Sequence, residues 1–204
     1  VYIITGVLLF WQINVASVKS GLENEFIRSL EVDKVFVLLD TKDRIKQIST
    51  AFTSIVKEDK KNVLYRLLQY SLFEESENDL NEMNQEAIYE YKHFDSYFID
   101  NDRYAFFIRE KETDKLLGFA MINEYLQKFK DGHSIAEYLV IPKYRRNKIG
   151  KKVAFEIFDK FPGNWEVRPS YNSEKAYLFW KKTIEEYTNN NCKFEDGIFL
   201  FNNK

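Results

Sequence analysis

Residues 137–157 have the sequence Glu-Tyr-Leu-Val-Ile-Pro-Lys-Tyr-Arg-Arg-Asn-Lys-Ile-Gly-Lys-Lys-Val-Ala-Phe-Glu-Ile. The apolar run predicts a strand that ends at Pro142, a basic turn follows, and Gly150 opens an amphipathic helix. The first N–H groups of a helix have no partner within it, and the helix dipole adds partial positive charge there. Six cations reinforce this effect: Lys143, Arg145, Arg146, Lys148, Lys151 and Lys152. The junction therefore predicts a binding site for a phosphorylated ligand.

The glycine spacing excludes two common nucleotide-binding turns, Gly-x-x-x-x-Gly-Lys-Ser/Thr and Gly-x-Gly-x-x-Gly, because neither occurs in the chain. The turn resembles instead the Arg/Gln-x-x-Gly-x-Gly/Ala motif of the GNAT superfamily of acyl-CoA-dependent N-acyltransferases. Arg145 falls on the Arg/Gln position and Gly150 on the final Gly/Ala position. Lys148 stands where the family usually has its first glycine. Because a glycine allows the backbone to approach the pyrophosphate closely, we expect this turn to bind a pyrophosphate more weakly or in a different way. The alternative interpretation is a basic loop before a surface helix.

The composition narrows the class of protein. The chain has 204 residues, of which 45% are hydrophobic and 17% aromatic, so we expect one domain with a real core plus an extension. The net charge of −2 indicates no general attraction to nucleic acid. A single cysteine, Cys192, excludes an internal disulfide and favours a cytoplasmic location. Because the chain has only two histidines, His93 and His133, we expect no metal site.

Residues 1–48 do not match the acyltransferase pattern. We interpret them as an N-terminal extension or a fragment of a preceding domain, and residues 49–204 as the GNAT-like domain. Within residues 1–16 the apolar run is interrupted by Gln12 and Asn14 and is too short to span a bilayer. We therefore expect a strand or buried helix there, and no membrane attachment. Further along, helical spacing covers 22–30 and a buried strand is predicted at 35–39.

From residue 50 onward, the hydrophobic periodicity predicts the order β, helix, helix, β, β, β, helix, β, helix, β. The predicted strands are 51–56, 104–109, 115–123, 134–141, 164–168 and 198–201, and the predicted helices are 60–73, 80–98, 149–160 and 173–187. This order indicates an α+β fold in which a mixed, mostly antiparallel twisted sheet is flanked by helices. It is also the order expected for a GNAT domain.

The resemblance implies that acetyl-CoA is the co-substrate and that it lies in a V-shaped gap between the strand before the turn and the next short strand. The pantetheine arm would pair with the main chain of Leu139 and Val140, and a backbone N–H there would polarise the thioester carbonyl. The cofactor-binding residues implied are Leu139, Val140, Arg145, Arg146, Asn147, Lys148, Ile149, Gly150, Lys151 and Ser173.

Glu137 is the candidate catalytic residue. It lies in an otherwise apolar strand, where burial would raise the pKa of its carboxyl group toward the range of a general base. Strand alternation places it on the same face as Leu139 and opposite Ala136 and Tyr138. The alternative is a carboxylate at the solvated end of the strand. Glu166 is a second candidate base, with a simple ion pair to Arg168 as its alternative role.

The helix at 173–187 departs from the family pattern. The motif Asn-x-x-Ala-x-x-Leu-Tyr-x-Lys, aligned on Ala176, puts Trp180 at the position of a tyrosine that would protonate the leaving thiolate. An indole N–H is no practical proton source at neutral pH. We therefore expect Trp180 to be a core aromatic, and another group or solvent to protonate the thiolate. Asn172 or Ser173 can still bind the pantetheine arm.

The acceptor site is expected between the two early helices and the loop near 125–132. Acidic and aromatic residues gather in that part of the sequence: Glu82, Glu86, Glu90, Asp95, Asp100, Asp102, Tyr89, Tyr91, Tyr97 and Phe98. They suit a small-molecule or peptide amine, including a cationic one, although charges on a helix are also usual on a solvated face.

Two further readings stay open. The first is a GNAT-fold domain that binds coenzyme A without turnover, as a sensor or assembly module. The second, a nucleic-acid-binding module, is disfavoured by the net charge. We expect a monomer or homodimer.

Overall fold

The computed structural model describes residues 36–39, 45–48, 51–78 and 80–204, and the chain divides into two compact units, Val1–Ser49 and Thr50–Lys204. In the first unit, β1 (Phe36–Leu39) pairs antiparallel with β2 (Ile45–Ile48). A strand is thereby confirmed within the predicted range 35–39, whereas the predicted burial of this strand stays a prediction. The elements predicted within residues 1–16 and 22–30 lie outside the described residues.

The second unit is built on a seven-stranded sheet with the strand order β3-β4-β5-β6-β7-β9-β8. Its β-strands are β3 (Ala51–Ile55), β4 (Arg103–Glu110), β5 (Leu116–Asn123), β6 (His133–Val140), β7 (Asn164–Val167), β8 (Lys193–Glu195) and β9 (Ile198–Asn202). All neighbouring strands are antiparallel except β6 and β7, which are parallel. The predicted fold class, a mixed and mostly antiparallel sheet flanked by helices, is confirmed.

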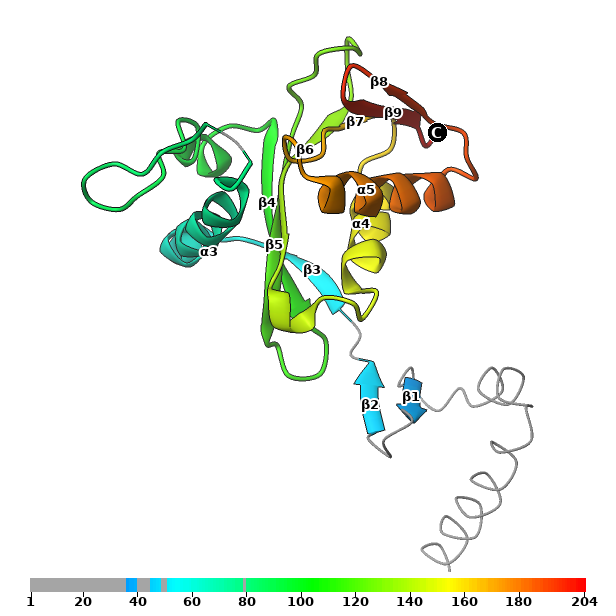
Figure 1. The fold of residues 1–204 in the computed structure, drawn as a ribbon, viewed down its shortest axis with the longest axis horizontal. Helices are drawn as coiled ribbons and strands as arrows, with labels where there is room; N and C mark the ends of the chain where they lie inside the picture. Colours follow the sequence, from blue (N-terminus) through cyan, green and yellow to red (C-terminus); the bar gives the residue numbers. More distant parts are fainter. Residues whose placement is uncertain (1–35, 40–44, 49–50, 79) are drawn as a thin grey trace, which may run out of the picture. The chain divides into compact units, whose positions relative to one another are not determined.

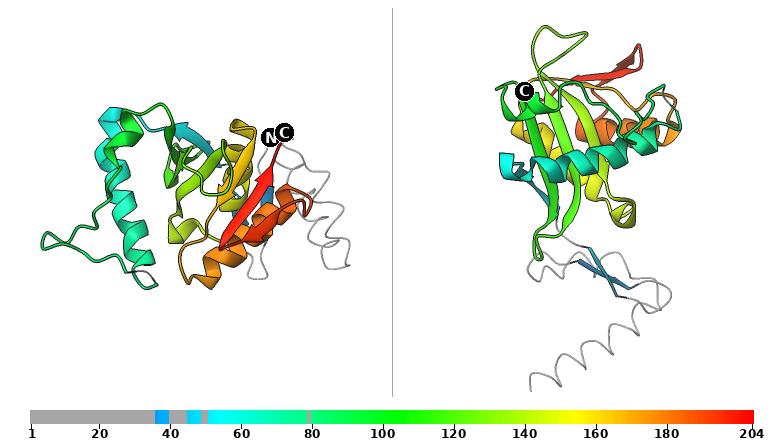
Figure 2. Two further views of the ribbon diagram at one scale, coloured as in Figure 1. Left: turned by 90° about the horizontal axis from the view of Figure 1, so that it is seen from above. Right: turned by 90° about the vertical axis from the view of Figure 1, so that its left-hand side faces the viewer.

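Helices cover both faces of this sheet (Figure 1). One face carries α3 (Lys61–Glu75), and the other carries α4 (Ile149–Lys160) and α5 (Glu174–Tyr187), as the view from above also shows (Figure 2). Short 3-10 helices occur at Glu58–Lys60, Asp95–Phe98 and Pro142–Tyr144. The sheet thus separates two hydrophobic clusters, one under α3 and one under α4 and α5.

The parallel pair β6–β7 separates partway along its length. The two strands pair only from His133 with Trp165 to Ile135 with Val167. Beyond that point β6 continues to Val140, and no described strand pairs with it on the β7 side. The edge of β6 that leads into the basic turn is therefore open to a further extended segment.

A β-bulge lies where the two strands part. In the pairing of β5 with β6, Met121 is opposite Glu137 and Ile122 is opposite Ile135, so Ala136 is the extra residue. Ala136 consequently packs in the α3-side cluster with Leu139, whereas Tyr138 packs on the other side. The prediction that Ala136 lies opposite Glu137 and Leu139 was wrong, because the bulge interrupts strict alternation.

Most predicted elements are confirmed to within two residues, and the helix at 149–160 matches α4. The helix predicted at 80–98 was wrong: only the 3-10 helix Asp95–Phe98 lies there, with an isolated bridge between Met83 and Tyr89. The side chain of Asn84 accepts hydrogen bonds from the amides of Glu86 and Ile88, and Ala87 has a positive φ of 58°. This local turn competes with a helix.

Candidate active site

The basic turn has an unusual backbone. Arg146 and Lys148 have φ values of 64° and 59°, while Asn147 between them is not in the left-handed region. Alternation of this kind directs successive N–H groups toward one concave side, the geometry of anion-binding nests. Lys148 is the N-cap of α4, whose first turn leaves its own N–H groups without intrahelical partners. Turn and helix together present a main-chain anion site.

Arg145 contacts protein atoms instead of extending into solvent. Its Nε donates to the carbonyl oxygen of Val140 over 2.7 Å, and its Nη2 lies 2.7 Å from Oε2 of Glu74 at the end of α3. Because Val140 is the last residue of β6, these bonds hold the turn against the strand end. Arg145 therefore holds the turn in place. The cations of the turn that lack such bonds to the protein are better placed to bind a ligand.

Close packing brings the start of α4 against α5 and β6. A Cβ atom on Gly150 would lie 3.1 Å from Cε2 of Phe179 and 3.6 Å from Cγ2 of Val140. The hydroxyl of Tyr138 donates to the carbonyl oxygen of Gly150 over 2.6 Å. Ile149 next to it is buried. This packing holds the helix N-terminus rigidly beside the open edge of β6.

Besides Glu74, a second carboxylate lies among the cations of this junction. Lys151 Nζ is 2.5 Å from Oε1 of Glu186 on α5, and both groups are partly exposed. The bond from Lys151, and the nearby charges of Lys151, Lys182 and Lys148, lower the pKa of the Glu186 carboxyl. Glu186 therefore stays ionised at neutral pH and holds one of the cations.

Glu137 lies on the α3 side of the sheet at the bulge. Its charge acts on two tyrosines there, Tyr91 and Tyr97, and raises the pKa of both. Burial and the charge of Glu137 raise the pKa of Tyr91 well above its usual value. Burial likewise raises the pKa of Tyr97. Both phenols therefore remain protonated and can donate hydrogen bonds throughout the physiological range.

The N-terminus of α5 is capped by Ser173, whose Oγ accepts the amide of Ala176 over 3.3 Å. Its hydroxyl hydrogen is still available for a ligand. Trp180 is buried and packs edge-on against Tyr138 and Phe179, with ring centroids 5.1 and 4.9 Å apart. The prediction that Trp180 is a core aromatic is confirmed.

Glu166 has a structural role that the sequence did not indicate. Only 3% of it is exposed, and its two oxygens accept the amides of Gln127, Lys128 and Phe129 over 2.6–2.8 Å. Arg168 bonds to Gln127 and to the carbonyl oxygen of Asp196 instead. The proposed ion pair between Glu166 and Arg168 was wrong. Glu166 anchors the loop after β5, and all the oxygens it could use as a base are engaged.

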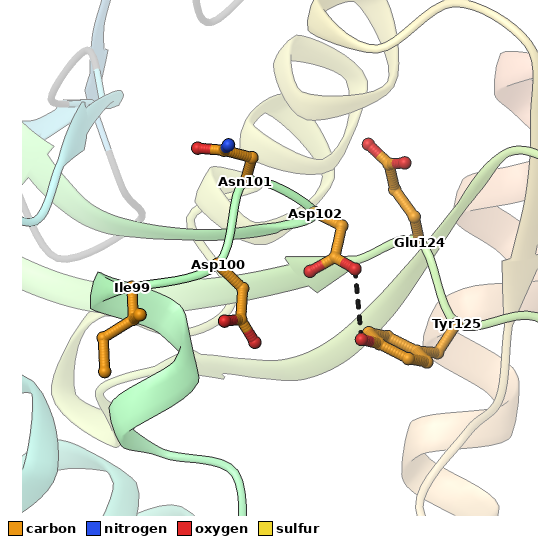
Figure 3. Close-up of a pocket in the computed structure, with 6 residues that line it drawn as sticks. All are labelled: Ile99, Asp100, Asn101, Asp102, Glu124 and Tyr125. Carbon is orange, nitrogen blue, oxygen red and sulfur yellow. Dashed lines mark hydrogen bonds between the residues drawn. The ribbon is translucent and has the colours of Figure 1, made fainter.

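An open depression of about 630 Å³ lies at the end of β4 and β5 remote from the basic turn (Figure 3). Its lining residues are Ile99, Asp100, Asn101, Asp102, Glu124 and Tyr125. The hydroxyl of Tyr125 donates to Asp102 Oδ2 over 3.1 Å. Beneath it, the Arg103 guanidinium lies 4.2 Å from the Tyr125 ring centroid. Of the predicted acidic wall, only Asp100 and Asp102 line this depression.

Sequence reasoning missed the roles of Tyr91, Tyr97 and Glu186. Tyr91 and Tyr97 were assigned to a helix facing an acceptor, but in the structure Tyr97 lies in the 3-10 helix Asp95–Phe98, and both tyrosines are near enough to Glu137 for its charge to raise their pKa. Their spacing contains no signal for this contact. Glu186 could have been noticed, because it lies two helical turns after Phe179 on α5, the helix that also carries the motif residue Trp180. No group of three His, Cys, Asp or Glu side chains in the described residues could hold a metal ion.

Comparison with known proteins agrees with this geometry. Residues 68–182 match the model of the acetyltransferase (GNAT) family, which is more than half of the chain. The chain therefore belongs to the GNAT acetyltransferase family, whose members use acetyl-CoA as a co-substrate. A search of curated proteins found no match. Within the described residues, no helix has the length and apolar character that crossing a bilayer requires.

Solved structures share the fold at low sequence identity. A nucleotide-linked sugar GNAT, FdhC in its apo form, has a TM-score of 0.52 and 12% identity over 76% of this chain and 87% of its own. A domain from Methanocaldococcus jannaschii has a TM-score of 0.50 and 11% identity over 76% and 99%. The spermidine N-acetyltransferase from Vibrio cholerae, in complex with CoA and spermine, has a TM-score of 0.46 and 9% identity over 74% and 91%.

The left-handed backbone of Lys148 explains why a glycine is usual at this position. A non-glycine residue in this conformation costs about 1–2 kcal/mol, whereas glycine adopts it freely but loses about 0.5–1 kcal/mol of chain entropy on folding. We expect Lys148→Gly to raise the free energy of unfolding by about 0.5 kcal/mol in urea denaturation. The control is Lys152→Gly, inside α4 and exposed, which should lower it by about 1 kcal/mol. Equal losses in both variants would contradict the expectation.

Proposed function

We propose that this chain is an N-acetyltransferase that moves the acetyl group of acetyl-CoA to a primary amine by direct attack in a ternary complex. The observation that carries the proposal is the parting of β6 from β7 beyond Ile135, directly before an anion-binding turn. An extended pantetheine arm fits the open edge of β6, and a diphosphate fits the amides at the start of α4.

The co-substrate would be held mainly by main-chain groups. Leu139 and Val140 would pair with the pantetheine amides, and Ser173 would donate its hydroxyl from the N-terminus of α5. The amides of Asn147, Ile149 and Gly150 would face the diphosphate, with the side chains of the turn adding positive charge. Arg145 would hold the turn against the end of β6. Arg146, Lys148 and Lys151 would attract the phosphates.

Few side chains take part directly in the proposed reaction. Holding amine and thioester together removes most of the entropic cost of their encounter. The amine nitrogen attacks the thioester carbonyl carbon, a backbone N–H of β6 stabilises the oxyanion, and the C–S bond breaks. Glu137 takes the proton that the amine loses. The coenzyme A thiolate leaves as the anion and is protonated by solvent, because buried Trp180 stands where a tyrosine would.

We propose a cationic acceptor, since the depression near β4 and β5 is lined by the carboxylates of Asp100, Asp102 and Glu124. None of its lining residues is a cation, and of its three carboxylates only Asp100 is paired with a neighbouring cation, Arg103, at 3.6 Å. A second positive group on the acceptor, as in a diamine, polyamine, aminoglycoside or lysine-containing peptide, would be attracted there.

Thiol release from acetyl-CoA, measured with a panel of amines and monoamine controls, tests this proposal. We expect release above the hydrolytic background with at least one diamine, and weaker release with a monoamine of equal length. Saturable acetyl-CoA binding without release would instead support a CoA-binding sensor or assembly module. The positive φ of Lys148 and the burial of Trp180 are the features that favour this second function.

A further inference from the structure

We propose that Glu166 is a positioning residue for the amine, because its buried carboxylate holds the loop 124–132 beside the place where the gap between β6 and β7 begins. The inference rests on the proposed function, in which acetyl-CoA occupies this gap and Glu137 accepts the proton of the amine. The loop starts with Glu124 and Tyr125 of the surface depression and would form one wall of the amine entrance.

The carboxylate of Glu166 bonds to three consecutive amides of the loop. Its Oε2 accepts the amide of Gln127 over 2.8 Å, and its Oε1 accepts the amides of Lys128 and Phe129 over 2.6 and 2.8 Å. Hydrogen bonds to an ionised group are stronger than those between neutral groups. Because only 3% of Glu166 is exposed, water does not readily replace these bonds. The carboxylate therefore fixes the backbone of the loop.

Strand alternation shows on which face of the sheet the loop lies. Trp165 and Val167, the neighbours of Glu166 in β7, pack in the cluster under α4 and α5. Glu166 therefore projects from the opposite face, the α3 side. Glu137 projects from the α3 side too, because it lies opposite Met121, which packs in the cluster under α3. The loop and the proposed base thus share one face of the sheet.

The anchor also lies at the level of the sheet where the gap begins. Glu166 pairs with Ser134, one position before the last pair of β6 and β7, which joins Ile135 to Val167. Successive residues of a strand are about 3.3 Å apart. The loop is therefore attached within one residue of the start of the gap. An amine that reaches the gap from the α3 side passes beside this loop.

Two exposed contacts hold the same loop against the turn between β8 and β9. Lys128 Nζ lies 2.5 Å from Asp196 Oδ2. Arg168 donates to Gln127 Oε1 over 2.9 Å and to the carbonyl oxygen of Asp196 over 3.3 Å. Exposed ion pairs contribute little to stability, so the buried carboxylate of Glu166 is the main anchor of the loop.

Glu166→Gln tests the inference, because an amide has one acceptor oxygen instead of two and turns donor hydrogens toward the loop. With the more active of putrescine and cadaverine, we expect the KM for the amine to rise at least fivefold. The KM for acetyl-CoA and the kcat at saturating amine should each change by less than twofold. Hydrogen exchange at the amides of 127–129 should become at least tenfold faster.

A second variant covers the case in which Glu166→Gln does not fold. Lys128→Met combined with Arg168→Met removes the two exposed contacts and keeps the buried carboxylate. It should raise the KM for the amine at least twofold and leave the KM for acetyl-CoA unchanged. An unchanged KM for the amine in this double variant would count against the loop as a wall of the entrance.

The matched control is Ile157→Ala, which truncates a fully buried side chain of α4 and tests whether lost stability alone produces the effect. Both variants are compared at a temperature at which each is fully folded. Ile157→Ala should leave the KM for both substrates unchanged. The inference is overturned by an unchanged KM for the amine or unchanged exchange in Glu166→Gln, by an equal rise for acetyl-CoA, or by an equal rise in Ile157→Ala.

Failure of the proposed function would give a different result. If the wild type released no thiol with any amine, the proposed function would be refuted. Calorimetric titration with cadaverine in the presence of coenzyme A would then decide the inference. The Kd should be at least fivefold higher in Glu166→Gln than in the wild type, whereas equal values, or no binding by the wild type, would overturn it.

Discussion

Replacing Glu137 with glutamine should lower kcat at least 100-fold. An amide has the size of the carboxylate, but it cannot take a proton from the attacking amine. Removal of a general base typically costs a factor of 10² to 10⁴. The KM for acetyl-CoA should change by less than twofold, since the proposed contacts to the co-substrate are made by main-chain groups and by the basic turn.

Steady-state kinetics at saturating acetyl-CoA, between pH 6 and pH 9, measure this effect. The control is Glu77→Gln, an exposed carboxylate just after α3. Its kinetics should match those of the wild type. If Glu137→Gln kept a kcat within fivefold of the wild-type value, Glu137 would not be the base. A loss that vanished at high pH, where amines deprotonate in solution, would support the assigned role further.

Charge reversal at the turn, Arg146→Glu with Lys151→Glu, should weaken acetyl-CoA binding at least tenfold, which corresponds to about 1.4 kcal/mol. Two attractive charges beside the diphosphate become repulsive ones. The release of Glu186 from its bond to Lys151 adds a third carboxylate, near which only Lys182 and Lys148 remain of the cations that lower its pKa. Because part of the interaction is exposed to solvent, the loss should shrink as the salt concentration rises.

Isothermal titration calorimetry at low and high salt measures this change. The control is Lys92→Glu with Lys111→Glu, which changes the net charge equally at exposed positions away from the turn. This control distinguishes the loss of local contacts at the turn from a general effect of the protein's net charge. Equal affinity of the reversed and wild-type chains would refute the proposed phosphate site, and an equal loss in the control would attribute the effect to net charge alone.

Several features were predictable because their signals are local. The helix at 149–160 follows from the spacing of Ile149, Val153 and Ile157, which are all fully or nearly fully buried. The strands β4, β5 and β6 follow from their apolar runs. By contrast, β8 was not predicted, because its three residues are all exposed and show no alternation. The segment 80–98 has helical periodicity, but the side chain of Asn84 and the positive φ of Ala87 give it a turn instead.

The candidate site likewise combines parts that could be predicted from the sequence with contacts that could not. The strand, turn and helix around Gly150 were recognisable because a phosphate cradle is made by consecutive residues. The partners of its charged side chains were not, since Glu74 holds Arg145 from α3 and Glu186 holds Lys151 from α5. The effect of the Glu137 charge on Tyr91 likewise joins two segments that are distant in the chain.

By itself, the amino-acid sequence was sufficient to predict the order of the elements, the class of fold and the place of the anion site. It also indicated, through the turn, that the chain belongs to the GNAT family. These depend on periodicity and on backbone properties of neighbouring residues. Only the tertiary structure showed that the gap between β6 and β7 begins after Ile135, that Glu166 anchors a loop, and that Tyr91 and Tyr97 lie near Glu137. Such contacts arise when distant segments pack around a common core, and their geometry is set by bulges, strand lengths and side-chain volumes acting together.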